Sequence, residues 1–174
     1  MVILTEASSS NFDVFLSFRG VDTRLGFVDH LHNALLDANL NTFLDDAEID
    51  NGDDLRPELE RAIKASRASI IVLSTNYASS TWCLDELVLI LTVVMILEQR
   101  LASGQLVIPI FYHVEPTHVK KQEGSFGVAM AEHRHKMQAE ANAAKKSKWA
   151  KKIDRWSNAL TQVAQLKGKD AKGR

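Results

Sequence analysis

Apolar positions along the chain follow two alternating spacings, which predict strands and helices in turn. Short apolar runs predict four strands, at residues 12–18, 41–45, 69–74 and 106–114. Apolar residues three and four apart predict helices in the intervals, at residues 24–38, from about residue 55, and at about residues 81–100. From residue 125 to about residue 166 the pattern is helical and mostly polar.

The alternation of strands with helices predicts the fold class, an α/β domain with a mostly parallel sheet and helices on both faces. Pro109 in the fourth strand has no N–H for a ladder bond, so one side of that strand should be incompletely paired. Any fifth strand should be short. Ligands of such sheets bind beyond the carboxyl ends of the strands. These ends are followed here by the loops at residues 19–24, 45–54, 75–81 and 115–124.

The length of 174 residues suits one domain with a single core. Residues 1–10 end in a run of serines and predict a flexible leader. The domain itself is predicted at residues 11–167. Residues 168–174 are rich in Lys and Gly and predict the start of a linker to further domains.

Charge is unevenly distributed along the chain. Residues 1–100 carry 7 Lys and Arg against 16 Asp and Glu, while residues 101–174 carry 14 against 6. Copies of such a domain could pack head to tail, or the two signs could simply form solvated faces. The single cysteine, Cys83, excludes an internal disulfide and fits a reducing compartment. With no signal peptide and no apolar run of ~18 residues, we expect a cytoplasmic or nuclear protein without a membrane partner.

The predicted helix at residues 81–100 carries two adjacent acids in different settings. A helical wheel places the core seam on Leu84, Leu87, Val88 and Leu91. Glu86 falls in a second apolar stripe with Trp82, Leu89, Ile90 and Val93, whereas Asp85 lies nearer Thr81 and Thr92. Glu86 is then either an ordinary acid of the first helical turn or a functional carboxylate, and its position alone leaves both interpretations open.

Other candidate chemistry is weaker. Residues 19–24 combine a glycine with two arginines, which suits phosphate, and Asp22 or Thr23 could cap the following helix. The alternative is a capped turn without a ligand. The histidine pairs 30/32 and 133/135 each lie two residues apart on helices and diverge, so we expect no metal site.

Four blocks of sequence carry a resemblance to a known family. They are Phe-Asp-Val-Phe-Leu-Ser-Phe-Arg-Gly-Val-Asp-Thr-Arg at residues 12–24, Tyr-Ala-Ser-Ser-Thr-Trp-Cys-Leu-Asp-Glu-Leu at 77–87, Ile-Pro-Ile-Phe-Tyr-His-Val-Glu-Pro-Thr-His-Val at 108–119 and Arg-Trp-Ser-Asn-Ala-Leu-Thr-Gln-Val-Ala at 155–164. In this order they resemble plant TIR domains, the Toll/interleukin-1 receptor homology domains of intracellular immune receptors. The resemblance extends from Asn11 to Leu166.

The resemblance implies a flavodoxin-like domain that self-associates and then hydrolyses NAD+ or NADP+ to nicotinamide and ADP-ribose products, triggering defence signalling and cell death. No cofactor is implied, because the dinucleotide is the substrate. The catalytic glutamate of the family's Trp-Cys-Leu-x-Glu-Leu motif corresponds to Glu86. By the same correspondence, the nucleotide pocket is expected to contain Arg19, Gly20, Asp45, Trp82 and Cys83, with Arg19 near phosphate and Trp82 near a ring.

Self-association residues also follow from the resemblance. His30 matches a Ser-His pair whose serine is Asp29 here, in a surface that is expected to combine the first helix with the last helix around Trp156. Gly168 matches a glycine of a second surface. The loop at residues 46–55 is expected to move over the site, and Asn51 stands where the family often has a basic residue.

Two alternatives to the hydrolase remain. The domain could be a homotypic signalling scaffold without turnover, or could form cyclic nucleotide monophosphates with help from Cys83. No basic stripe interleaved with aromatic residues supports nucleic-acid binding, and the lysines between 145 and 152 are more simply the solvated face of a helix.

Overall fold

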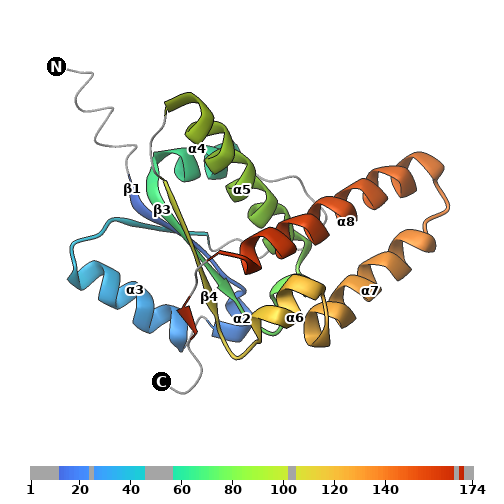
Figure 1. Cartoon of the computed structure of the whole chain (residues 1–174), viewed down its shortest axis with the longest axis horizontal. Helices are drawn as coiled ribbons and strands as arrows, with labels where there is room; N and C mark the ends of the chain where they lie inside the picture. The colour runs from blue at the N-terminus through green and yellow to red at the C-terminus, as the bar shows by residue number, and fades with distance from the viewer. Residues whose placement is uncertain (1–11, 24–25, 46–56, 102–104, 167–168, 171–174) are drawn as a thin grey trace.

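The structure is a computed structural model, which describes residues 12–23, 26–45, 57–101, 105–166 and 169–170 (Figure 1). Its centre is a five-stranded sheet in which all paired strands are parallel, in the order β2-β1-β3-β4-β5. The strands are β1 (Phe12–Ser17), β2 (Thr42–Leu44), β3 (Ser66–Leu73), β4 (Leu106–Phe111) and β5 (Lys169–Asp170). The predicted fold class is confirmed.

The edge beyond β4 is short. β4 pairs with β3 over six residues, from Leu106 to Phe111, but its described pairing with β5 involves only Ile110 and Phe111. The fifth strand is therefore short, as the missing N–H of Pro109 predicts. It lies within the tail that was predicted to begin a linker, so part of that tail belongs to the sheet.

Helices cover both faces of the sheet. They are α2 (Gly20–Thr23), α3 (Phe27–Asp37), α4 (Pro57–Ala65), the 3-10 helix η1 (Tyr77–Ser79), α5 (Thr81–Leu101), α6 (Pro116–Lys121), α7 (Gly124–Gln138) and α8 (Ala143–Ala164). Figure 1 shows α3 on one side of the sheet and α4, α5 and α8 on the other. The long helical stretch expected after residue 125 is two helices, because the chain turns at residues 139–142 before Asn142 caps α8.

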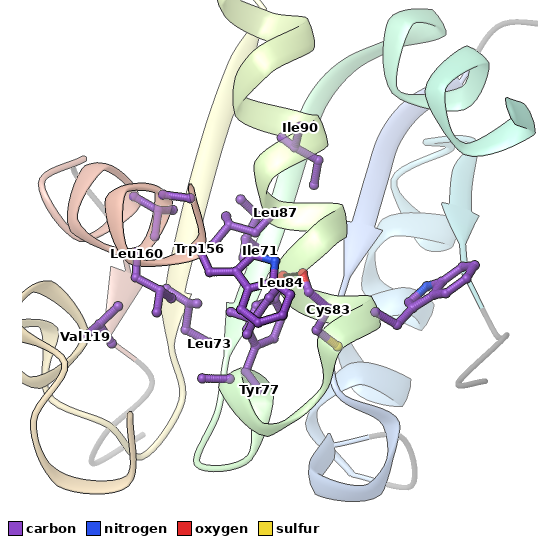
Figure 2. Packing of buried hydrophobic residues seen from close by; sticks show 14 of the residues in the cluster. Ile71, Leu73, Tyr77, Cys83, Leu84, Leu87, Ile90, Val119, Trp156 and Leu160 are labelled. Carbon is purple, nitrogen blue, oxygen red and sulfur yellow. Dashed lines mark hydrogen bonds between the residues drawn. The ribbon is translucent and has the colours of Figure 1, made fainter. Parts of the chain in front are cut away.

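Alternation along the strands supplies a core to each face. In β1, Phe15 packs with the larger cluster under α4, α5, α7 and α8, while Val14 and Leu16 pack with the smaller cluster under α3. In β3, Ile71 and Leu73 face the larger cluster. Figure 2 shows residues of α5 and α8 converging in that cluster, with Trp156 of α8 directed toward α5. The first turns of α5 belong to this cluster through Cys83, Leu84 and Leu87.

The predicted seam of α5 is only partly correct. Leu84 and Leu87 are fully buried, but Val88 and Leu91 are half-buried at the margin of the cluster, and Ile90 from the second stripe is fully buried. Both stripes are therefore covered, because α5 packs between the sheet, α4 and α8. No helix in the described part of the chain has the length and apolar character needed to cross a membrane.

Candidate functional site

The predicted site residues lie where the carboxyl ends of β1 and β2 face the start of α5. Arg19 and Gly20 follow β1, and Asp45 directly follows β2. These two strands are neighbours in the sheet, so their following loops emerge side by side. Trp82, Cys83 and Glu86 lie in the first two turns of α5.

Ser80 fixes the beginning of α5. Its hydroxyl accepts a hydrogen bond from the backbone N–H of Cys83 over 3.1 Å, and its carbonyl accepts one from Leu84, also over 3.1 Å. A serine at this position satisfies a helix donor that would otherwise lack a partner. The defined start places Trp82 and Glu86 four residues apart, on one face of the helix.

Trp82 connects α5 to β2. Its indole Nε1–H donates a hydrogen bond to Oδ2 of Asp45, across 37 residues of sequence. Trp82 is 7% exposed and Asp45 is 8% exposed, so this bond is shielded from water. The indole therefore has a fixed orientation beside Asp45, at the carboxyl end of β2.

Tyr77 connects α5 to β1. Its hydroxyl lies 3.1 Å from the backbone carbonyl of Cys83 and 2.8 Å from Oγ of Ser17, the last residue of β1. The Sγ of Cys83 lies 3.5 Å from the carbonyl of Phe18 and forms a second link to the same strand end. Burial, followed by the nearby Cys83 and Glu86, raises the pKa of Tyr77 well above 10.0. The phenol is therefore protonated near neutral pH.

Glu86 is a buried acid. Its side chain is 2% exposed, on a helix whose neighbouring residues form the larger core cluster. Glutamate is rarely buried to this extent, because removing a carboxylate from water costs free energy. Glu86 also lies in the second turn of α5 and not in the first, so the interpretation as an ordinary first-turn acid is wrong.

The adjacent Asp85 has a structural role. Its Oδ1 accepts a hydrogen bond from Nε1 of Trp156 over 2.8 Å, and its Oδ2 lies 3.3 Å from Nζ of Lys152. Both partners belong to α8. The predicted contrast between the two acids is therefore present: Asp85 attaches α5 to α8, while Glu86 is buried.

Asp22 does not cap the following helix. Its carboxylate accepts hydrogen bonds from Oγ of Ser74, from the backbone N–H of Asn76 and from Nδ2 of Asn76, over 2.6 to 2.8 Å. The residue at the start of α3 is Gly26, which makes no side-chain cap. The capping prediction for Asp22 is therefore wrong, and this carboxylate instead joins the loops after β1 and β3.

The residues expected in self-association surfaces do not form one surface in the described part of the chain. Asp29 and His30 are exposed on α3. Trp156 is 1% exposed and packs against the rings of His133 and Trp149, so it cannot itself form a surface. The expectation of one surface that joins α3 to α8 around Trp156 is corrected for a second reason, because these helices cover opposite faces of the sheet (Figure 1). Gly168 and the loop at residues 46–55, including Asn51, lie outside the described residues.

Sequence reasoning missed Tyr77, Ser17 and Ser80, which connect the site to its strands. Two signals were available. Ser17 is a polar residue at the end of an apolar strand, and Tyr77 is a tyrosine shortly before the start of a helix. His133 was considered only for metal binding. It is buried, its Nε2 donates to the carbonyl of Ala78 over 2.8 Å, and the neighbouring His135 is exposed, so this pair does diverge.

Comparison with known proteins identifies clear relatives. A family model described as "TIR domain" matches residues 11–173. The chain is 49% identical over 160 residues to "Disease resistance protein RPV1" of Vitis rotundifolia, covering 92% of this chain and 10% of that protein. It is 42% identical over 168 residues to "TMV resistance protein N" of Nicotiana glutinosa, covering 97% of this chain and 13% of that protein. It thus spans about a tenth of the length of such relatives.

A solved structure gives the same assignment of fold. It is that of the TIR domains in the activated Roq1 resistosome directly recognizing the pathogen effector XopQ. The TM-score is 0.73 and the identity 41%, with 94% of this chain and 89% of that chain covered.

Proposed function

The chain belongs to the TIR domain family, and from this premise we propose that it is the signalling domain of a plant disease-resistance protein and hydrolyses NAD+ or NADP+ when copies self-associate. The products would be nicotinamide and ADP-ribose-type molecules, which initiate defence signalling and cell death inside the cell. The observation that carries the proposal is the buried carboxylate of Glu86 beside the strand ends where α/β proteins bind ligands.

The chemistry suits a single carboxylate. Breaking the bond between nicotinamide and ribose creates positive charge on the ribose, which a fixed negative charge stabilises. Nicotinamide takes both bonding electrons and leaves as a neutral molecule, so no general acid is needed for its departure. Water then adds to the ribose carbon and releases a proton. Glu86 is the residue proposed to stabilise the cation or to hold the ribose hydroxyls.

The neighbouring residues are proposed to bind the rest of the dinucleotide. Arg19 has a guanidinium group suited to the phosphates, and Gly20 allows the backbone to approach them closely. Trp82 offers an aromatic face, whose orientation the bond to Asp45 fixes. Cys83 belongs to the same turn of α5 and connects it to Phe18.

Burial of Glu86 supports a requirement for assembly. At 2% exposure in the single chain, the carboxylate is accessible to a dinucleotide only if adjacent groups move. Contacts between copies could select the open arrangement, because a partner shifts a conformational equilibrium by binding one state more tightly. The relative of known structure consists of TIR domains in an activated assembly, which supports the same proposal.

Release of nicotinamide from NAD+ by the purified chain, measured over a wide range of protein concentration, tests this function. We expect the rate per chain to rise with concentration. Glu86→Gln removes the charge with little change of shape and should lower the rate by about 100-fold or more. Glu98→Gln, an exposed position on the same helix, is the matched control and should retain activity. Activity retained by a folded Glu86→Gln variant would remove the catalytic assignment.

The alternative is a homotypic scaffold without turnover, favoured by the exposed Asp29 and His30 and by the assembled relative. It predicts no nicotinamide release at any concentration, together with intact self-association of the Glu86→Gln variant. Measuring turnover and association in the same samples separates the two functions.

A further inference from the structure

A cavity of about 340 Å³ lies between the end of α7 and the beginning of α8. These two helices run side by side and project away from the sheet (Figure 1). The described residues that line the cavity are four lysines, one acid, one methionine and one indole, namely Lys136, Lys145, Lys148, Lys152, Glu140, Met137 and Trp149. We call it the lysine cleft. Its volume falls within the range of ~300–1,000 Å³ that is typical of small-molecule sites.

The lysines of α8 converge on this cavity. Lys145, Lys148 and Lys152 are separated by three and four residues, so they share one face of the helix. Two of them lie near the N-terminus of α8, where the helix dipole disfavours positive charge, and its first turn contains no acid. This arrangement concentrates positive charge around a cavity. A helical face that is simply exposed to solvent would not require such a concentration.

The described residues neutralise little of this charge. Lys152 pairs with Asp85 over 3.3 Å. Among the residues that the structure describes, no carboxylate forms an ion pair with Lys136, Lys145 or Lys148. Glu140 supplies the one acid of the lining, so the cleft has a surplus of positive charge. Lysine ammonium groups in such a setting suit phosphate oxygens.

Trp149 gives the cleft a fixed aromatic wall. Its Nε1–H donates a hydrogen bond to the backbone carbonyl of His133 over 3.2 Å. Its ring meets Trp156 edge to face, with the centroids 6.0 Å apart. The indole is partly exposed where it lines the cavity. A ring held from two sides loses little freedom when a planar ligand stacks on it.

From these features we propose that the lysine cleft binds a nucleotide, with its phosphates on the lysines and its base against Trp149. The cleft offers a contact to each half of such a ligand. An aromatic side chain holds a base by stacking, and several ammonium groups hold phosphates. Glu140 can accept a hydrogen bond from a ribose hydroxyl. Glu86 is not among the described residues that line the cleft, and the inference does not depend on the proposed hydrolase activity.

The test uses ADP as the probe and the indole N–H signals of the ¹⁵N-labelled chain. We expect ADP to shift the Trp149 signal saturably. Lys145→Gln with Lys148→Gln should weaken this binding by about tenfold or more, since each lost phosphate contact costs affinity. Lys120→Gln with Lys121→Gln removes the same charge from exposed positions on α6 and should leave binding unchanged. Equal weakening by both pairs would overturn the proposal.

Fragments of the probe test its two halves. Adenosine and pyrophosphate should each bind about tenfold or more weakly than ADP. Pyrophosphate binding as tightly as ADP would overturn the nucleotide assignment and leave a phosphate site. Affinity that rises steadily with the length of an oligonucleotide would instead indicate a nucleic-acid surface and would also overturn it.

The signal of Trp82 reports separately on the proposed active site, because its indole bonds to Asp45. A shift of Trp82 without any shift of Trp149 would overturn the lysine cleft while leaving the hydrolase proposal in place. A shift of Trp149 alone, in a chain that releases no nicotinamide, would support the cleft and count against the hydrolase.

Discussion

The hydroxyl of Tyr77 donates a hydrogen bond to the backbone carbonyl of Cys83 over 3.1 Å. Because a carbonyl only accepts, this bond uses the single phenolic proton, and Oγ of Ser17 must be the donor in the 2.8 Å contact with the same hydroxyl. The relay therefore has a fixed direction from β1 through Tyr77 to the first turn of α5. It holds the helix three residues before Glu86.

Loss of this relay should destabilise the domain. Tyr77→Phe removes the hydroxyl that bonds to Oγ of Ser17 and to the carbonyl of Cys83. Because two buried polar groups lose this partner, we expect the free energy of unfolding to fall by about 1–3 kcal/mol. Urea denaturation followed by circular dichroism measures the change. Tyr112→Phe removes the other tyrosine hydroxyl of the chain and keeps the ring stacked on Phe27, so it should have a smaller effect. Equal stability of the two variants would contradict the structural role of the relay.

Tyr77 should also make the domain sensitive to alkali. Its raised pKa means that the native state holds the phenolic proton to a higher pH than the unfolded chain does. Above pH ~10 the unfolded chain therefore binds fewer protons, and the free energy of unfolding falls as the pH rises. Below that pH the contribution is fully present. Between pH 9 and 11 the free energy of unfolding should fall less steeply in Tyr77→Phe than in Tyr112→Phe. Identical slopes would refute the assignment.

The bond from Trp156 to Asp85 should matter more than the charge of Asp85. Asp85→Asn keeps an oxygen for the indole N–H and loses only the partly exposed ion pair with Lys152, so a cost of at most ~1 kcal/mol is expected. Asp85→Ala leaves the buried indole N–H unpaired and should cost about 1–3 kcal/mol. Thermal and urea unfolding of both variants provide the comparison. Equal losses of stability in the two variants would show that the ion pair with Lys152 contributes more than the hydrogen bond from Trp156.

Self-association is expected to depend on the exposed face of α3. His30→Ala should weaken association by about tenfold, the scale of an energetically important contact residue. His135→Ala is the control, because that histidine is also exposed but lies on α7. Analytical ultracentrifugation measures the association constants, and nicotinamide release at a fixed concentration should fall in parallel with His30→Ala. Unchanged association would exclude this face of α3 from the interface.

Much of the fold could be predicted because it follows from local patterns. The buried runs around Phe15 and Ile71 indicated strands, and their alternation with helices indicated a parallel sheet. The same periodicity placed Glu86 in a second apolar stripe of α5. It could not show that neighbouring elements bury this stripe as well, so the acid could equally have been a solvated helix residue.

Other predictions failed where the partner lies far along the chain. Asp22 stood where it could cap the predicted helix, but Ser74 and Asn76, which follow it by 52 and 54 residues, donate its hydrogen bonds. The resemblance placed Trp156 in a self-association surface, yet its side chain is buried against His133 and Trp149. From the sequence, the lysines of α8 were interpreted as a solvated helical face. Only the turn of the chain between α7 and α8 brings Lys136 to the same cavity.

The sequence alone therefore determined the order of the four predicted strands and of the main helices between them, the parallel sheet and the edge at which its loops emerge, since hydrophobic periodicity and chain handedness act over short distances. The tertiary structure decided which polar side chains meet. The contacts from Asp85 to Lys152 and from Trp82 to Asp45 span 67 and 37 residues. Such contacts form only after the elements pack. Packing also buries these polar groups and strengthens their hydrogen bonds, and no local pattern in the sequence contains that burial.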